Sequence, residues 1–236
     1  MMRKQRGFLL YPARFRGGGG GGADPYFPNV SILLHMDGAN GSKAFPDSSA
    51  SPKIVTPGGN AKISTSQYVF GGASADFDGA GDYLSSPSGS AFQFPGDFTV
   101  EFWARATAFK GSDILYDGRA SGGSPTGFAI YLAGGGALSV YSGGLVIAGA
   151  SVGLNVWRHI ALCRSGTSTR LFIDGTQSGA TWNTAANFSD GRFLAGIDSN
   201  LSAGSFQGSI DELRVTKGVA RYTANFTPPN TPFPSS

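Results

Sequence analysis

The chain has 236 residues and a formal net charge of +3 at pH 7, with 37 glycines and a single cysteine. This length suits one large all-β domain, and the low content of charged residues (14%) with many glycines is typical of short strands joined by tight turns. The single cysteine, Cys163, excludes an intrachain disulfide, and no apolar run approaches the roughly 18 to 20 residues of a membrane span. We expect Cys163 to be a buried structural thiol.

The first 16 residues combine positive charge with large apolar side chains, and six glycines, Gly17 to Gly22, follow them. Glycine runs behave as flexible tethers, so we predict an arm that docks on other subunits of an assembly. The alternatives are a disordered terminus and a basic segment that binds packaged nucleic acid. The arm residues are Arg3, Lys4, Arg6, Phe8, Leu9, Leu10, Tyr11, Arg14, Phe15 and Arg16.

Outside this arm, the chain has 13 basic and 15 acidic residues, so the body lacks the excess of positive charge typical of a nucleic-acid-binding domain. Residues 23–29 form a proline-bounded linker, ADPYFPN. The sequence therefore divides into an arm with its linker, residues 1–29, and a folded body, residues 30–236, which ends in a proline-rich tail.

About a dozen strands are predicted in the body, separated by turns rich in glycine. Residues 98–105 show the clearest alternation, with Phe98, Val100 and Phe102 on one face of the strand. Turn signals at short intervals, without a helical pattern, favour a β-sandwich of two antiparallel sheets, a jelly roll. The predicted strands are residues 30–36, 63–70, 82–84, 98–105, 114–117, 127–132, 137–142, 145–148, 157–164, 169–174, 193–197 and 210–215.

Six blocks in order carry a family resemblance over about residues 30 to 229. They are LLHMDGANGSKAFPDSS (33–49), FDGAGDYLSSP (77–87), DFTVEFWAR (97–105), WRHIALCRSGTSTRLFIDGTQSG (157–179), FLAGIDSN (193–200) and SIDELRVTKGVARYTANFTPP (209–229). Together they resemble the laminin-G-like (concanavalin A-like) domain of the subgroup found in bacteriophage virion proteins. The resemblance implies a jelly roll, a fold that carries lectins, adhesion modules and enzymes alike.

The resemblance also implies a calcium site where the first and last strands meet. The matching positions are Asp37, in HMDG, and Asp211, in SIDEL, with backbone carbonyls supplying the remaining oxygens. The alternative is that Asp37 caps a turn and Asp211 pairs with a basic side chain.

Glycan binding is a second property that the resemblance implies. Sugar sites stack an aromatic ring on the apolar face of the sugar and add an acid or amide for its hydroxyls. The candidates are Trp182, in GATWNTAAN, and Tyr141, in SVYSGG, both beside glycine-rich loops. For Trp182 the alternative is simple packing within its loop.

A glycoside hydrolase on this fold would need two carboxylates that flank the sugar. Glu101 and Glu212 are the only glutamates, and the adjacent Asp211 and Glu212 are expected to point to opposite faces of their strand. The catalytic spacing is absent, so we predict that the protein is not an enzyme.

The sequence thus predicts a non-enzymatic structural or adhesion protein of a phage virion, assembled in the cytoplasm of a bacterial host. The arm would dock on other virion proteins, and the sandwich would face outward. No membrane partner is expected, surface glycans are a further partner class, and homo-oligomer formation is left open. The alternatives are a glycan-binding lectin or receptor-recognition module and, third, a glycoside hydrolase.

Overall fold

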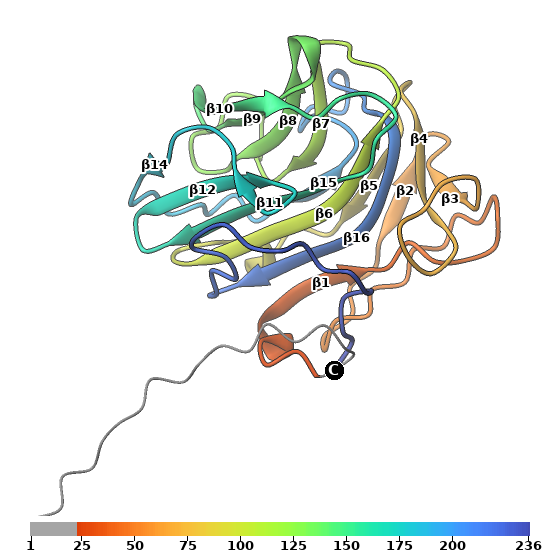
Figure 1. Ribbon diagram of the computed structural model, residues 1–236, viewed down its shortest axis with the longest axis horizontal. Coiled ribbons are helices and arrows are strands. Elements are labelled where there is room, and N and C mark those ends of the chain that lie inside the picture. The colour runs from red at the N-terminus through yellow and green to blue at the C-terminus, as the bar shows by residue number, and fades with distance from the viewer. Residues whose placement is uncertain (1–22) are drawn as a thin grey trace, which may run out of the picture.

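A computed structural model describes residues 23–236, so the predicted docking arm lies outside the described residues. Two antiparallel sheets pack face to face (Figure 1), which confirms the all-β sandwich. The nine-stranded sheet has the order β13 (Thr176–Gln177), β12 (Ser168–Ile173), β11 (Arg158–Ser165), β6 (Phe98–Ala106), β16 (Gln207–Lys217), β4 (Ser74–Asp78), β3 (Lys62–Ser64), with β1 (Val30–Leu34) paired to β16 and β14 (Trp182–Asn183) paired to β12.

The seven-stranded sheet forms the other layer. Its order is β10 (Leu145–Ser151), β9 (Ala137–Tyr141), β8 (Ala129–Ala133), β7 (Ser112–Asp117), β15 (Phe193–Ala195), β5 (Tyr83–Ser86), β2 (Thr56–Gly58). Three short 3-10 helices complete the described elements: Phe27–Asn29, Ser90–Phe92 and Gly134–Gly136. None of the helices in residues 23–236 is long and apolar enough to cross a membrane.

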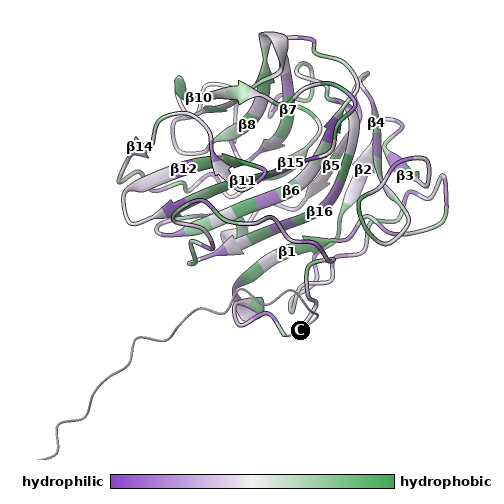
Figure 2. Ribbon diagram, viewed as in Figure 1, coloured by the Kyte–Doolittle hydropathy of each residue, from purple (hydrophilic) through white to green (hydrophobic). Residues whose placement is uncertain are grey.

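The core lies between the sheets and is rich in phenylalanine. Phe98, Val100 and Phe102 of β6 are fully buried there, as the alternation in this strand predicts, and polar residues interrupt the apolar ones along β6 and β16 (Figure 2). Cys163 is buried as expected, and burial raises the pKa of its thiol to about 12. It is therefore a structural thiol rather than a reactive one.

The strand expected at residues 63–70 ends at Ser64. Beyond it, the backbone N–H groups of Val69 and Phe70 donate to the carboxylate of Asp211 instead of to a neighbouring strand. Strands β2, β4, β13 and β14 are short, and the sequence did not predict them.

The folded body begins before the boundary expected at residue 30. The Asp24 carboxylate accepts hydrogen bonds from Arg214 (3.2 Å) and Arg221 (2.7 and 3.1 Å). The backbone N–H of Asp24 donates to the carbonyl of Ser236 (2.7 Å). Asp24 therefore belongs to the body rather than to a linker, because a buried arginine needs an anionic partner. The N-terminal end of the described chain and the C-terminus lie together (Figure 1).

Asp211 and Glu212 do not point to opposite faces of their strand as expected, because a β-bulge interrupts β16. The pairing with β6 shifts register between Asp211 and Arg214, and Glu212 has a φ of +49°. Ile210 and Leu213 on either side both face the core, so the two acids between them lie together on the outer side of the sheet.

Candidate functional site

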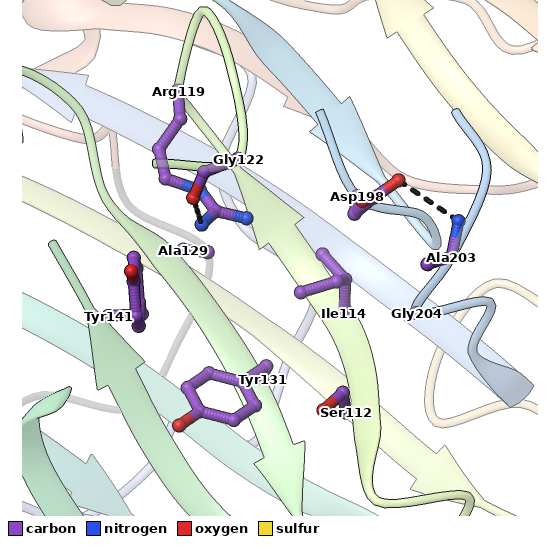
Figure 3. A pocket seen from close by; sticks show the side chains of 10 residues that line it. All are labelled: Ser112, Ile114, Arg119, Gly122, Ala129, Tyr131, Tyr141, Asp198, Ala203 and Gly204. Carbon is purple, nitrogen blue, oxygen red and sulfur yellow. Dashed lines mark hydrogen bonds between the residues drawn. The ribbon is translucent and has the colours of Figure 1, made fainter. Parts of the chain in front are cut away.

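A pocket of about 340 Å³ opens on the outer face of the seven-stranded sheet (Figure 3). Strands β7, β8 and β9 form its floor, and two loops, residues 118–128 and 196–206, form its walls. The lining residues are Ser112, Ile114, Arg119, Gly122, Ala129, Tyr131, Tyr141, Asp198, Ala203 and Gly204.

Two tyrosines form the aromatic part of this floor. Ile130 of β8 and Val140 of β9 face the core, so Tyr131 and Tyr141, which alternate with them, face outward. Tyr141 lies opposite Ala129 in the ladder, which makes Tyr131 its diagonal neighbour on the same face. Both rings are half-buried, so each still offers surface to a ligand.

Arg119 stands above Tyr141, with its guanidinium carbon 5.1 Å from the ring centre. Its Nε and Nη2 donate to the two carboxylate oxygens of Asp117, at 2.9 and 2.6 Å, and its Nη1 donates to the carbonyl of Gly122. Burial raises the pKa of Asp117, whereas the hydrogen bonds and charge of Asp117 outweigh burial and raise the pKa of Arg119. The guanidinium is thus held rigidly, and its charge is matched by a buried carboxylate.

Asp198 enters the pocket from the opposite wall. Its Oδ1 accepts the N–H groups of Ser202 (3.1 Å) and Ala203 (3.2 Å), which fixes the loop, while Oδ2 has no hydrogen-bond partner within residues 23–236. The loop is also tied to the floor, because the Ser199 N–H donates to Asp117 at 2.9 Å. A free carboxylate oxygen across from two tyrosine rings can accept hydroxyl protons from a molecule that lies on those rings.

The structure separates the two aromatic residues predicted for glycan contact. Tyr141 lines the pocket, whereas Trp182 lies on β14 and packs beside Phe188, with ring centres 5.8 Å apart, against the core. Sequence reasoning missed Tyr131, Arg119 and Asp198. The outward position of Tyr131 in the alternating segment AIYLA was a usable signal, but the loop residues gave none.

Of the two predicted calcium ligands, Asp211 lies on β16 of the other sheet, and Asp37 lies in the loop that follows β1. Asp211 is buried, its Oδ2 accepts the N–H groups of Val69 (2.7 Å) and Phe70 (3.1 Å), and its Oδ1 has no partner in the described chain. Burial raises the pKa of this carboxyl to about 7. Asp37 lies against Gly71, where any Cβ would collide with its carboxylate.

Both acids lie near His35, whose Nδ1–H donates a 2.8 Å hydrogen bond to Glu212. That bond raises the pKa of His35 against the effect of burial, and the charges of Asp37 and Asp211 raise it further. Within residues 23–236 there is no cluster of three or more histidine, cysteine or acidic side chains suited to a metal. The one buried oxygen that the described residues leave without a hydrogen-bond partner here is Oδ1 of Asp211, a carboxylate oxygen of the kind that calcium binds.

Glu101, one of the two glutamates considered for catalysis, is buried and fully hydrogen-bonded. It is 0% exposed, and it accepts hydrogen bonds from Arg214 (3.0 and 2.8 Å) and from the hydroxyl of Tyr222 (2.9 Å). His159, also fully buried, lies 3.4 Å away. Tyr222 and Phe226 of the C-terminal tail stack at 3.5 Å and pack on this side of the sheet, so no substrate reaches Glu101 in this arrangement.

A family model described as "Concanavalin A-like lectin/glucanases superfamily" matches residues 78–221. No curated protein matches the sequence.

Several solved structures share the fold at low identity. Domain 4 of AbnA, a GH43 extracellular arabinanase from Geobacillus stearothermophilus in complex with arabinotriose, is 17% identical over 81% of this chain and 94% of that chain, with a TM-score of 0.59. The binding domain of Paraclostridial Mosquitocidal Protein 1 is 13% identical over 81% of this chain and 49% of that chain (TM-score 0.61). Trypanosoma rangeli sialidase in complex with sialic acid is 15% identical over 88% of this chain and 31% of that chain (TM-score 0.59).

Proposed function

Because the chain belongs to the concanavalin A-like lectin/glucanases superfamily, we propose that its sandwich is a non-catalytic adhesion module that binds a glycan. The observation that carries this proposal is the pocket on the seven-stranded sheet, where Tyr131 and Tyr141 lie on one side and Asp198 on the opposite wall. Stacked rings with one or two fixed polar groups are the usual means of holding a sugar. The arabinotriose complex of domain 4 of AbnA, a similar fold, is consistent with such a role.

The absence of catalysis is part of the proposal. Hydrolysis of a glycoside needs two carboxyl groups on either side of the bond. Of the acids in residues 23–236, Asp198 alone lines this pocket, Asp117 below it is paired with Arg119, and Glu101 lies buried on the other sheet.

We also propose that the module is displayed on a phage particle, with residues 1–22 attached to another virion protein. The described chain starts beside Ser236, near β1, whereas β7, β8 and β9, which carry the pocket, lie at the far end of the body (Figure 1). An attachment at the first end would leave the pocket facing outward. Deletion of residues 1–22 should leave a folded body that no longer joins the particle, and unchanged incorporation would contradict this display.

Binding of the full-length protein to a glycan array, followed by calorimetric titration of the best glycan, tests the glycan-binding function. The array should include arabinotriose, lactose, sialylated lactose and host-surface oligosaccharides. We expect saturable binding with a Kd between about 10 μM and 1 mM, typical of one small, partly open pocket. Silence across the array, with the protein shown to be folded, would contradict the glycan-binding function.

We further propose that Asp37 and Asp211 hold a calcium ion, which would fix the turn at residues 69–72 against β16. Calcium at about 100 times its Kd should raise the free energy of unfolding by about 2.7 kcal/mol relative to chelator. Asp211→Asn should abolish this increase while still accepting the N–H groups of Val69 and Phe70 through its amide oxygen. The measurement is thermal unfolding in calcium and in chelator.

Asp78→Asn is the matched control for the calcium test, because Asp78 is an exposed acid on β4 away from this turn. It should keep the full response to calcium. An unfolding midpoint of the wild type that is the same in calcium and in chelator would overturn the calcium site.

A further inference from the structure

A second pocket, of about 390 Å³, lies on the same outer face of the seven-stranded sheet, over β2, β5 and β15. Tyr83, Arg192 and Leu201 are among its lining residues. Four residues that bear hydroxyl groups also line it: Thr56, Ser85, Ser86 and Ser88. Ser85 faces this pocket, and its hydroxyl donates to the carbonyl of Thr56 at 3.2 Å, whereas Ser86 lies opposite the core residue Phe193 and is buried.

The charge of Arg192 sets this pocket apart. Its Nη1 donates to the carbonyls of Ala120 (3.3 Å) and Ser199, while Nε and Nη2 have no hydrogen-bond partner among the described residues. Arg192 also forms no ion pair within residues 23–236, in contrast to Arg119, which is paired with Asp117. The second pocket therefore holds a guanidinium with free N–H donors and no counter-ion among the described residues, which is the chemistry that recognises an anion.

The two pockets share a wall. The carbonyls that hold Arg192 belong to the loops that also carry Arg119 and Asp198 of the first pocket. Between β8 and β5 the sheet places β7 and β15, so the two floors are about 14 Å apart at the usual strand spacing. A short oligosaccharide, rather than a single sugar, spans this distance.

Leu201 at the tip of the shared wall supports a role in binding. It is 43% exposed, and its φ of +56° is the left-handed conformation that branched side chains rarely adopt. Such strain is retained where a local conformation serves a ligand site. The exposed leucine gives the ligand an apolar contact between the two pockets.

We infer that the pocket around Arg192 binds an anionic group, a carboxylate or a sulfate, of a glycan whose neutral part lies on Tyr131 and Tyr141. The inference rests on the proposed glycan binding and names its ligand class, an acidic oligosaccharide. The opposite orientation is disfavoured because Asp198 lines the first pocket, while the charge of Arg119 there is already matched by Asp117 beneath the floor. The acidic unit is thus repelled from the tyrosines and attracted to Arg192.

Matched neutral and acidic probes test this inference on the full-length protein. Lactose, 3′-sialyllactose and 3′-sulfolactose share one neutral unit and distinguish a carboxylate from a sulfate, and galactotriose with trigalacturonate forms a second pair. In calorimetric titration at about 50 mM NaCl, we expect an acidic member to bind about five to ten times more tightly than its neutral counterpart. The preference should shrink at about 500 mM NaCl, because salt screens an exposed ion pair.

Arg192→Gln should remove the preference and leave the affinity for the neutral probe unchanged, whereas Arg192→Lys should keep most of it. Arg105→Gln is the matched control: it removes one positive charge from the other sheet, where Arg105 bonds to Asn155, and should change nothing. If Arg192→Gln disturbs the loops, the affinity for the neutral probe will fall too. The test then rests on two other results: Arg192→Lys should keep the preference for the acidic probe, and salt should weaken this preference in the wild type.

Two results would overturn the inference: equal binding of neutral and acidic probes by the wild type, or an acidic preference that survives in Arg192→Gln. In both cases binding of the neutral probe would still support the proposed function. If the folded protein binds no probe in these series or on the array, both this inference and the proposed glycan binding are overturned.

Discussion

Replacing Arg214 with methionine is expected to lower the free energy of unfolding by about 3 kcal/mol, the cost of leaving a buried carboxylate without its main partner. Arg214 is 4% exposed, and it joins Glu101 to Asp24 while its guanidinium carbon lies 3.9 Å from the ring centre of Phe233. For a domain of this size the loss corresponds to a Tm lower by roughly 6 to 12 °C, measured by calorimetry.

Arg158→Met provides the matched control. Arg158 also forms an ion pair, with Asp174 at 2.7 Å, but the two side chains are 35% and 37% exposed. An exposed pair contributes at most about 1 kcal/mol, so this variant should unfold within a few degrees of the wild type. Equal losses in the two variants would contradict the structural role assigned to the buried cluster.

The same cluster predicts how the effect of Arg214→Met depends on pH. Burial acts to raise the pKa of Glu101, but the charges of Arg214 and Arg221 outweigh it and hold this pKa well below its ordinary range. A depressed pKa in the folded state contributes stability in full above the unfolded value, about 4.3, and loses it as the pH falls further. The difference in stability between the wild type and Arg214→Met should therefore shrink below about pH 4.

The largest expected effect on binding is that of Tyr141→Ala. Removing an aromatic ring that lines a small site should cost about 2 kcal/mol, or roughly a 30-fold weaker Kd for the best glycan of the array. Tyr141→Phe keeps the ring and should bind within a few-fold of the wild type, because stacking needs the ring rather than its hydroxyl. Calorimetric titration of each variant measures the change.

Tyr68→Ala is the control for this prediction. Tyr68 is 50% exposed in the turn after β3 and does not line the pocket, so its loss should leave glycan binding unchanged. If Tyr141→Ala bound the glycan with wild-type affinity, the glycan would have to bind somewhere other than on these tyrosines.

Alternation was enough to predict most strands of the sandwich. In β6 the spacing of Phe98, Val100 and Phe102 predicted which face is buried, because successive side chains of a strand point to opposite sides. The same rule places Tyr131 and Tyr141 outward. It failed in β16, where the bulge at Glu212 adds one residue and puts two adjacent acids on the same side.

The sequence by itself thus determined the fold class, the buried face of β6 and the burial of Cys163, because these depend on the local order of polar and apolar residues. Tertiary structure alone decided the rest. Arg119, Asp198 and Arg192 come from loops up to about 80 positions apart, and they meet because β15 lies beside β7 in the sheet. Strand order results from the packing of the whole chain, and no local sequence pattern encodes which loops will lie side by side around the pockets.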